Sequence, residues 1–260
     1  MTRLARRYGT RPDIPDPRDD EYRVPPRVRR RLPRAVDLRP GCPPVYDQGS
    51  LNACSAHAIA AALWFDELER AGSTVPGPSR LFLYYNERAR QDLVGTNAPV
   101  SLRDGYRSIE HTGTCPESRW PYDVARFARK PSPACYRAAR DLRVIAYARV
   151  RQEAMSLRGA LAQRHPIAFG ISVFESFESP RVRRTGRVPV PGHDEHHLGG
   201  HALLLVGYDD ARRVFIARNS WGPRWGLGGY CEMPYAYALN PALAWDFWIA
   251  RRLLPRRRGK

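Results

Sequence analysis

The stretch Asp47-Gln-Gly-Ser-Leu-Asn-Ala-Cys54-Ser-Ala-His-Ala58 places a cysteine at the start of an alanine-rich helical pattern, a few residues after Gln48. The free N–H groups in the first turn of a helix favour a thiolate over a thiol, so they lower the pKa of a cysteine placed there. A nearby carboxamide can donate a hydrogen bond to the oxyanion that forms when the thiolate attacks a carbonyl. The stretch therefore predicts that Cys54 is a nucleophile; the alternative is a small buried cysteine of a helix.

Two apolar runs farther along the chain carry the other groups that a cysteine nucleophile needs. His201 opens the strand-like run 202–206, and a second short run ends at Asn219. The turn residues between them predict a hairpin, which would bring His201 close to Asn219. The Asn219 carbonyl oxygen can then accept from one imidazole nitrogen and leave the other for the sulfur, with Trp221 covering the bond. Taken singly, the histidine fits a structural turn and the asparagine a capped turn equally well.

The order Gln, Cys, His, Asn-Ser-Trp-Gly is hard to explain as coincidence. The chain resembles the papain-like cysteine peptidases, as a prokaryotic-type member without a long helical prosegment, over about residues 32–250. The matching motifs are Leu32-Pro33, Val36-Asp37-Leu38-Arg39, Asp47-Gln48-Gly49-Ser50, Cys54, Trp120-Pro121-Tyr122, Gly200-His201-Ala202, Val206-Gly207-Tyr208, Asn219-Ser220-Trp221-Gly222, Trp225-Gly226 and Gly229-Tyr230.

Position by position, the resemblance implies Cys54 as the nucleophile, His201 as general base and acid, Asn219 as the residue that orients the imidazole, and Gln48 as an oxyanion donor. It implies a cysteine endopeptidase that hydrolyses peptide bonds through a thioester acyl-enzyme, with no cofactor and no metal. A related acyl-transfer enzyme, such as a transpeptidase or amidase, and a catalytically weak binding homologue are the alternatives.

The chain departs from the family pattern on both sides of the nucleophile. Leu51 stands where the family commonly has a disulfide-forming cysteine, and Ser55 replaces a tryptophan that packs behind the site. Neither change removes a reacting group, so we expect both to bear more on stability than on chemistry.

Hydrophobic periodicity divides the chain into a helical front half and a sheet-rich back half. Helices are predicted at 53–71, from Ser79 to about Arg90, at Leu102–His111 and at about 153–164; strands at Leu142–Val150, Ile167–Phe174, the His201–Asn219 hairpin, Tyr230–Met233 and Phe247–Arg251. This order predicts an α+β protein of two lobes, papain-like, with the active site in the cleft between them.

The predicted domains follow from this division. They are an extended N-terminal arm over 1–35, a mainly helical lobe with the nucleophile over 36–140, a β-rich lobe with His201 and Asn219 over 141–252, and a basic tail over 253–260. The arm is too short and proline-rich for a helical prosegment; Tyr8, Ile14, Tyr22 and Val24 are its candidate anchors. Either the enzyme is made active, or its control lies elsewhere.

The 260 residues carry a net charge of +17, which would ordinarily raise nucleic acid or an anionic membrane as a partner. Of the 43 basic residues only Lys130 and Lys260 are lysine, and the arginines are scattered along the chain. This usage is more typical of genome composition bias than of a binding surface. We therefore expect a peptide or protein substrate, no nucleic acid, and at most a modest attraction to acidic surfaces.

No apolar stretch reaches the length of a membrane span, and the basic N-terminus lacks the apolar core of a signal peptide. A cytoplasmic location is the expectation, with secretion by another route as the alternative. With Cys54 as the nucleophile, Cys42, Cys115, Cys135 and Cys231 allow at most two disulfides in three connectivities, or remain thiols in a reducing compartment.

The cluster Gly192-His-Asp-Glu-His-His197 just before His201 is the remaining unusual motif. Its histidines and carboxylates could bind zinc. A solvated loop at the rim of the cleft is the favoured interpretation, in which His196 and His197 contact substrate and make cleavage sensitive to pH.

Overall fold

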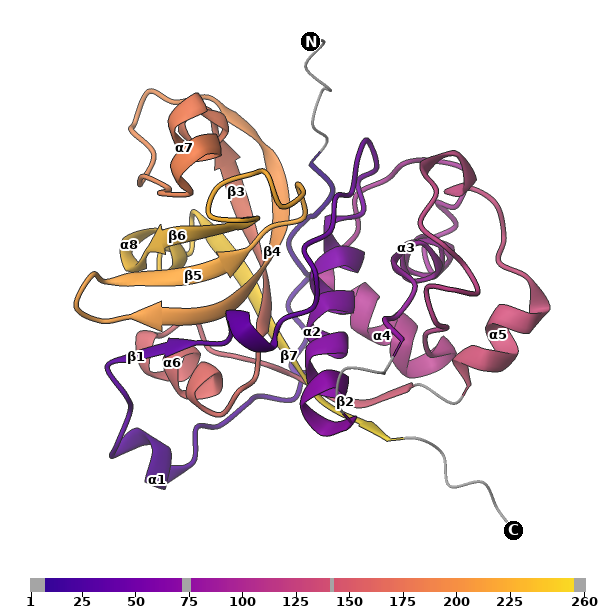
Figure 1. Ribbon diagram of the computed structural model, residues 1–260, viewed down its shortest axis with the longest axis horizontal. Helices are drawn as coiled ribbons and strands as arrows, with labels where there is room; N and C mark the ends of the chain where they lie inside the picture. The colour runs from indigo at the N-terminus through magenta and orange to yellow at the C-terminus, as the bar shows by residue number, and fades with distance from the viewer. Residues whose placement is uncertain (1–7, 72–75, 141–142, 255–260) are drawn as a thin grey trace.

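The computed structural model describes residues 8–71, 76–140 and 143–254 and sets a group of helices beside an antiparallel sheet (Figure 1). The long helix α2, Cys54–Ala71, stands between the sheet and the helices α3, Arg80–Ala89, and α4, Leu102–Thr112. Its alanine-rich sequence lets strands and helices approach closely from both sides, and most of its side chains are buried. The α+β organisation expected from the sequence is present.

The helix ends follow local capping chemistry. The Ser79 hydroxyl accepts from the Phe82 N–H at 3.0 Å and so caps α3. Ser101 caps α4 in the same way, from the Asp104 N–H at 3.2 Å. Gly113 ends α4 with a φ of 79°, a conformation that glycine adopts without strain. The three long helices of the front half, α2, α3 and α4, were therefore predicted to within a residue or two.

The sheet has the order β2-β7-β3-β4-β5-β6, and β1 pairs with β4 off this path. All these pairings are antiparallel. The strands are β1 Ala35–Asp37, β2 Arg143–Arg149, β3 Ile167–Phe174, β4 His197–Asp209, β5 Val214–Arg218, β6 Tyr230–Pro234 and β7 Ala244–Leu254.

One detail of the predicted hairpin is wrong. His201 does not open its strand but lies inside β4, which begins at His197, and it pairs with Ile171 of β3. The reason is that Gly199 and Gly200, poor strand formers by themselves, are held in the ladder by β3. His201 is consequently fixed by strand pairing with β3.

Several short elements were not predicted. They are the helices α1 Pro26–Arg29, α5 Pro133–Ala139, α7 Pro180–Thr185 and α8 Tyr235–Ala238, and the 3₁₀ turns Arg39–Gly41, Val124–Arg126 and Glu175–Glu178. The predicted helix at about 153–164 is α6, Ala154–Ala162. Over its described residues, from 8 onward, the arm is extended except for a turn at 16–19 and for α1, which begins with Pro26, a residue suited to a first turn.

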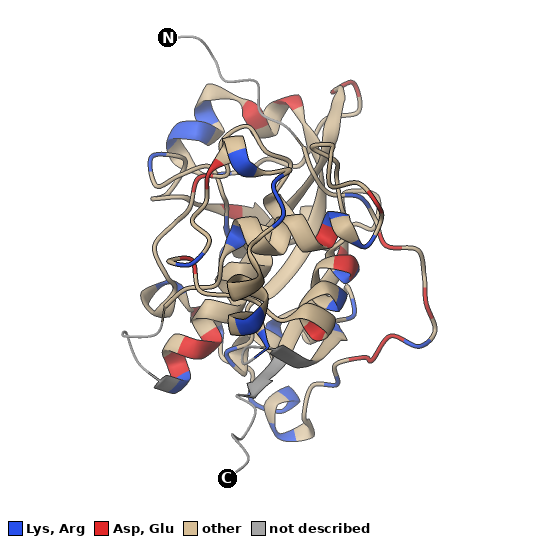
Figure 2. Cartoon of the chain, turned by 90° about the vertical axis from the view of Figure 1, so that its right-hand side faces the viewer, with Lys and Arg blue, Asp and Glu red and all other residues tan. Residues whose placement is uncertain are grey.

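Charged residues of both signs are interspersed over helices and loops in Figure 2. Within the part of the chain that the structure describes, no helix combines the length and the apolar character needed to cross a membrane.

Candidate active site

The cysteine at the start of α2 is completely buried against the sheet. Cys54 is 0% exposed, and backbone N–H groups of Ala202 and Ser55 hydrogen-bond its sulfur. Ala202 follows His201 in β4, so the sulfur lies beside the strand residue that was predicted to serve as base. The helix start and the middle of β4 thus meet at this point.

The histidine and the asparagine are joined directly. His201 Nε2 lies 2.8 Å from Asn219 Oδ1, and both side chains are buried. Asn219 directly follows β5, the neighbour of β4, so the hairpin positions the pair. Trp221 stacks on the imidazole with 4.7 Å between ring centroids, which shields the bond from water. Since Nε2 faces Asn219, the role predicted for the imidazole at the sulfur falls to Nδ1.

The carboxamide of Gln48 is held by the same loop. Ser220 Oγ donates to Gln48 Oε1 at 2.5 Å, and Gln48 Nε2 donates to the Leu51 carbonyl at 2.8 Å. An amide nitrogen has two hydrogens, so one remains for a further acceptor. The Gln48 backbone is fixed as well, since its N–H donates to the Ser220 carbonyl at 2.9 Å. The structure therefore brings Gln48 and Asn219 together through Ser220.

The N-terminal arm covers this constellation. Gly9 donates a backbone hydrogen bond to the Cys54 sulfur, while its carbonyl accepts from the Val100 N–H at 3.1 Å. The next residue, Thr10, donates its N–H to the Gly200 carbonyl at 3.2 Å. A side chain at position 9 would collide with the Asn52 carbonyl, so only glycine fits there. The arm thus crosses the site between the helices and β4.

Tyr8 continues this cover over the imidazole. Its ring lies edge-on to His201, with 6.4 Å between centroids, and its hydroxyl donates to Glu178. His201 is 0% exposed as a result of this and the surrounding packing. In the structure described, neither Cys54 nor His201 is accessible from solvent.

The arm also explains why the predicted low pKa of the cysteine is wrong. Burial raises the pKa of Cys54 to about 11, although hydrogen bonds from Ala202, Gly9 and Ser55 act in the opposite direction. A thiolate without solvent is costly, and three backbone N–H groups do not replace the water that the arm excludes. In the closed arrangement Cys54 therefore remains a protonated, unreactive thiol.

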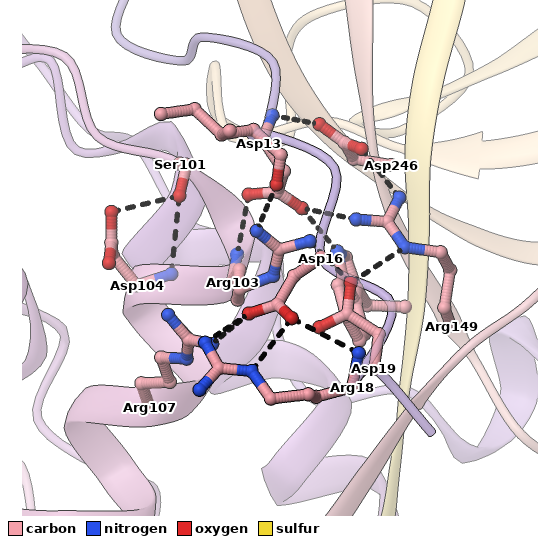
Figure 3. Close-up of polar contacts among 12 residues, drawn as sticks. Asp13, Asp16, Arg18, Asp19, Ser101, Arg103, Asp104, Arg107, Arg149 and Asp246 are labelled. Atoms are coloured by element: carbon pink, nitrogen blue, oxygen red, sulfur yellow. Dashed lines mark hydrogen bonds and ion pairs between the residues drawn. The ribbon is translucent and has the colours of Figure 1, made fainter. Parts of the chain in front are cut away.

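The arm is fastened by buried carboxylates (Figure 3). The Asp13 side chain is 0% exposed and accepts from Trp248 Nε1 at 2.8 Å and from Arg149 Nη2 at 3.1 Å. Its backbone N–H donates to Asp246 Oδ2 at 2.5 Å. Burial and the nearby Asp13 charge raise the pKa of Asp246, and a hydrogen bond from Arg149 partly offsets this rise. This part of the arm is held by β2 and β7.

Asp16 and Asp19 attach the following residues of the arm to α4. Asp16 pairs with Arg107 at 3.0 Å, and Asp19 pairs with Arg103 and also with Arg149 Nε at 3.3 Å. Hydrogen bonds from Arg18, and then Arg107, hold the pKa of Asp16 well below its usual range. Because α4 and the sheet both contribute, the arm binds the helices and the sheet to each other.

Of the proposed anchors of the arm, Tyr22 and Val24 are buried and Tyr8 is partly buried. Ile14 is wrong as an anchor, because it is 83% exposed. The sequence reasoning looked for apolar contacts, whereas acidic side chains do most of the fastening. The alternation of Asp and Pro in the arm was the available signal.

Another feature escaped the sequence reasoning. Ser55, beside the nucleophile, donates to Glu87 Oε2 at 2.7 Å, and this carboxyl group of α3 is completely buried. Burial raises the pKa of Glu87 to about 8, so it is a neutral acid at pH 7. The position left by the family's tryptophan is thus filled by a small polar pair.

The remaining cysteines and histidines form no metal centre in the described residues, where no group of three or more His, Cys, Asp or Glu side chains could hold an ion. All five cysteines are free thiols, and Cys115 is hydrogen-bonded to Cys135. In the histidine-rich segment, His193 and His196 are exposed and His196 lies 3.4 Å from Glu175, while His197 begins β4.

Comparison with known proteins assigns this constellation to a family. The sequence model of the family described as papain family cysteine protease matches residues 83–240, which include His201 and Asn219. The chain is 39% identical over 215 residues to an uncharacterized peptidase C1-like protein of Acanthamoeba polyphaga mimivirus, covering 80% of this chain and 69% of that protein. It is 26% identical to cathepsin Q of Rattus norvegicus, covering 79% of this chain but only 59% of the cathepsin.

Solved structures agree with the sequence matches. The crystal structure of xylellain, a cysteine protease from Xylella fastidiosa, superposes with a TM-score of 0.89 at 40% identity and covers 96% of each chain. A digestive procathepsin L 3 of Tenebrio molitor, with a TM-score of 0.67 and 21% identity, shares the fold. The chain therefore belongs to the papain family of cysteine proteases.

Proposed function

We propose that this cysteine peptidase hydrolyses peptide bonds with Cys54 as the nucleophile, His201 as base and acid, Asn219 as the orienting residue and Gln48 as an oxyanion donor. The observation that carries the proposal is the 2.8 Å contact between His201 Nε2 and Asn219 Oδ1, which Trp221 covers. The residue after His201, Ala202, hydrogen-bonds the Cys54 sulfur through its backbone N–H. The form described is a latent one, because the arm covers both reacting groups.

Displacement of the arm starts the proposed cycle. Water then reaches the site, the penalty on a charged sulfur falls, and the proton of Cys54 passes to His201 Nδ1. The Nε2–H of the resulting imidazolium donates to Asn219 Oδ1, which keeps the ring in the plane needed for transfer.

Acylation and deacylation follow the chemistry of a thioester. The thiolate attacks the peptide carbonyl carbon, and the oxyanion accepts hydrogen bonds from Gln48 Nε2 and the Cys54 N–H. The intermediate collapses with cleavage of the C–N bond, and His201 gives its proton to the leaving amine. Water, deprotonated by His201, then hydrolyses the thioester, releasing a carboxylic acid and restoring the thiol.

Labelling of Cys54 by iodoacetamide at pH 6, before and after removal of the arm by limited proteolysis, tests the proposal together with a peptide cleavage assay. We expect the arm-free protein to label rapidly and to cleave, and His201→Ala to abolish both properties. Labelling of the arm-free protein no faster than an ordinary thiol would refute a nucleophilic Cys54 and favour a binding homologue. Transfer of the acyl group to an added amine, in place of hydrolysis, would identify a transpeptidase.

A further inference from the structure

A small cavity lies behind the proposed catalytic asparagine, between α2 and the β4–β5 hairpin. It offers about 10 Å³, close to what a single water molecule requires. Its walls include His57 and Ala58 of α2, Leu204 of β4, and Arg218, Asn219 and Ser220 at the end of β5. The cavity therefore connects the helix that carries Cys54 to the loop that carries Asn219.

The protonation of His57 follows from its contacts. Nδ1 lies 2.8 Å from the Ala53 carbonyl, which can only accept, so Nδ1 carries the hydrogen. Burial lowers the pKa of His57 to about 3, so the ring is neutral and Nε2 is an acceptor. Nε2 is buried and has no hydrogen-bond partner among the described residues. The rings of Tyr46 and Tyr122 hold the imidazole edge-on, at 5.9 and 4.8 Å between centroids.

The orientation of the Asn219 amide is equally determined. Its Oδ1 accepts from the Ser220 backbone N–H at 2.8 Å, and a backbone N–H can only donate. Nδ2 is therefore a donor; it is buried and also lacks a partner in the described part of the chain. One wall of the cavity thus supplies an unpaired donor and another an unpaired acceptor, on side chains that are each 2% exposed.

We propose that the cavity binds one water molecule, which accepts a hydrogen bond from Asn219 Nδ2 and donates one to His57 Nε2. Buried polar groups are normally paired, and a water molecule satisfies a donor and an acceptor at once. Ser220 and Arg218 line the same cavity. The water is a fixed part of the structure.

This assignment makes His57 a positioning residue for the proposed reaction, and in this respect it rests on the proposed function. Rotation of the Asn219 amide by half a turn would put Nδ2 against His201 and Oδ1 against the water. The Nδ2 hydrogens would then face the Ser220 N–H, which is also a donor, and the bond to the imidazolium would be lost. By holding the water that accepts from Nδ2, His57 helps to keep the amide in the orientation in which Oδ1 faces His201.

A crystal structure of the wild-type protein at high resolution tests the site without reference to activity. We expect an electron-density peak within hydrogen-bond distance of both Asn219 Nδ2 and His57 Nε2. A dry cavity would overturn the proposal even for an active enzyme. An inactive wild-type enzyme with the water in place would refute the proposed function alone.

Kinetics of the whole chain, opened by the substitution Asp13→Ala that removes a buried anchor of the arm, test the positioning role. His57→Phe keeps an aromatic ring between the tyrosines but removes the acceptor, and the exposed His111→Phe is the matched control. We expect His57→Phe to lower kcat by about 10- to 100-fold with KM unchanged, as misplacement of a reacting group does. The basic limb of the pH profile should move to lower pH, because the imidazolium loses support.

A double variant separates positioning from a general effect on the fold. In an Asn219→Ala background, His57→Phe should cause no further loss of kcat, because the residue through which His57 acts is gone. An undiminished further loss would overturn the role of His57. If His57→Phe fails to fold, as judged by circular dichroism, the crystallographic result decides the proposal.

Discussion

Replacing Asp13 with alanine should open the site at a distance from the reacting groups. The carboxylate is completely buried and receives hydrogen bonds from Trp248, Arg149 and the Arg103 backbone N–H. Removing one partner of a buried charged pair typically costs about 3–5 kcal/mol. The lower end applies, because Arg149 keeps Asp19 and Asp246 as partners and Asp246 is freed from a neighbouring charge.

A loss of about 3 kcal/mol in arm docking raises the ratio of open to closed protein by about 100-fold. Cys54 reacts only in the open form, so its rate of alkylation at fixed iodoacetamide concentration should rise by the same factor. Mass spectrometry of the peptide that contains Cys54 measures this rate directly. The free energy of unfolding of the whole domain, followed by urea titration, should fall by no more than the docking energy.

The exposed neighbour Asp20 provides the matched control, since its substitution by alanine removes an acidic residue from the same arm without removing an anchor. We expect Asp20→Ala to label at the wild-type rate. If Asp13→Ala and Asp20→Ala label equally slowly in folded protein, the carboxylate does not fasten the arm and the explanation of latency given above is wrong.

Three other expectations can be checked with simple variants. In the arm-free enzyme, Gln48→Ala should lower kcat by about 100- to 1,000-fold, and an unaltered kcat would exclude an oxyanion role. The melting temperature should also fall, because the substitution removes two buried hydrogen bonds. Because the pKa of Glu87 is raised, the folded state keeps a proton that the unfolded state releases above pH 4.5. The free energy of unfolding should therefore fall as pH rises from 4.5 to about 8, by at most about 1.4 kcal/mol per pH unit. Urea titrations of Glu87→Gln should show a weaker dependence of this free energy on pH, and the same dependence as in the wild type would show that another group titrates. Diamide should oxidise Cys115 and Cys135 to a disulfide by taking one hydrogen from each thiol. This disulfide should stabilise the fold by about 3 kcal/mol. A peptide map without the cross-link would contradict the contact between the two thiols.

Local chemistry was sufficient to predict the long elements. The apolar spacing of 53–71 and the serines ahead of α3 and α4 act within one or two helical turns, and those helices are where the sequence placed them. The pairing of His201 with Asn219 also followed from a hairpin, a local structure. The short helices α5 and α7 begin at Ser-Pro pairs that are equally typical of turns, which is why they were missed.

Long-range contacts set the limit of the sequence reasoning. The arm was expected to be extended, but nothing within it shows that Gly9 lies on Cys54 or that Asp13 lies beside Trp248. Burial raises the pKa of Cys54 and acts against the helix start, so the sign of the shift depends on the packing around the sulfur. A prediction from the helix start alone was therefore bound to fail for the closed form.

The acidic arm hides three guanidinium groups, those of Arg103, Arg107 and Arg149, which lie on both α4 and β2. When the arm leaves, these cations lose the carboxylates of the arm together, whereas Arg149 keeps Asp246 of β7. The opened enzyme therefore gains positive charge on this face. Dissolved salt weakens the attraction that keeps the arm in place and provides counterions for the uncovered arginines. Ionic strength should accordingly act on this enzyme as an activator, through a part of the molecule that never touches the scissile bond.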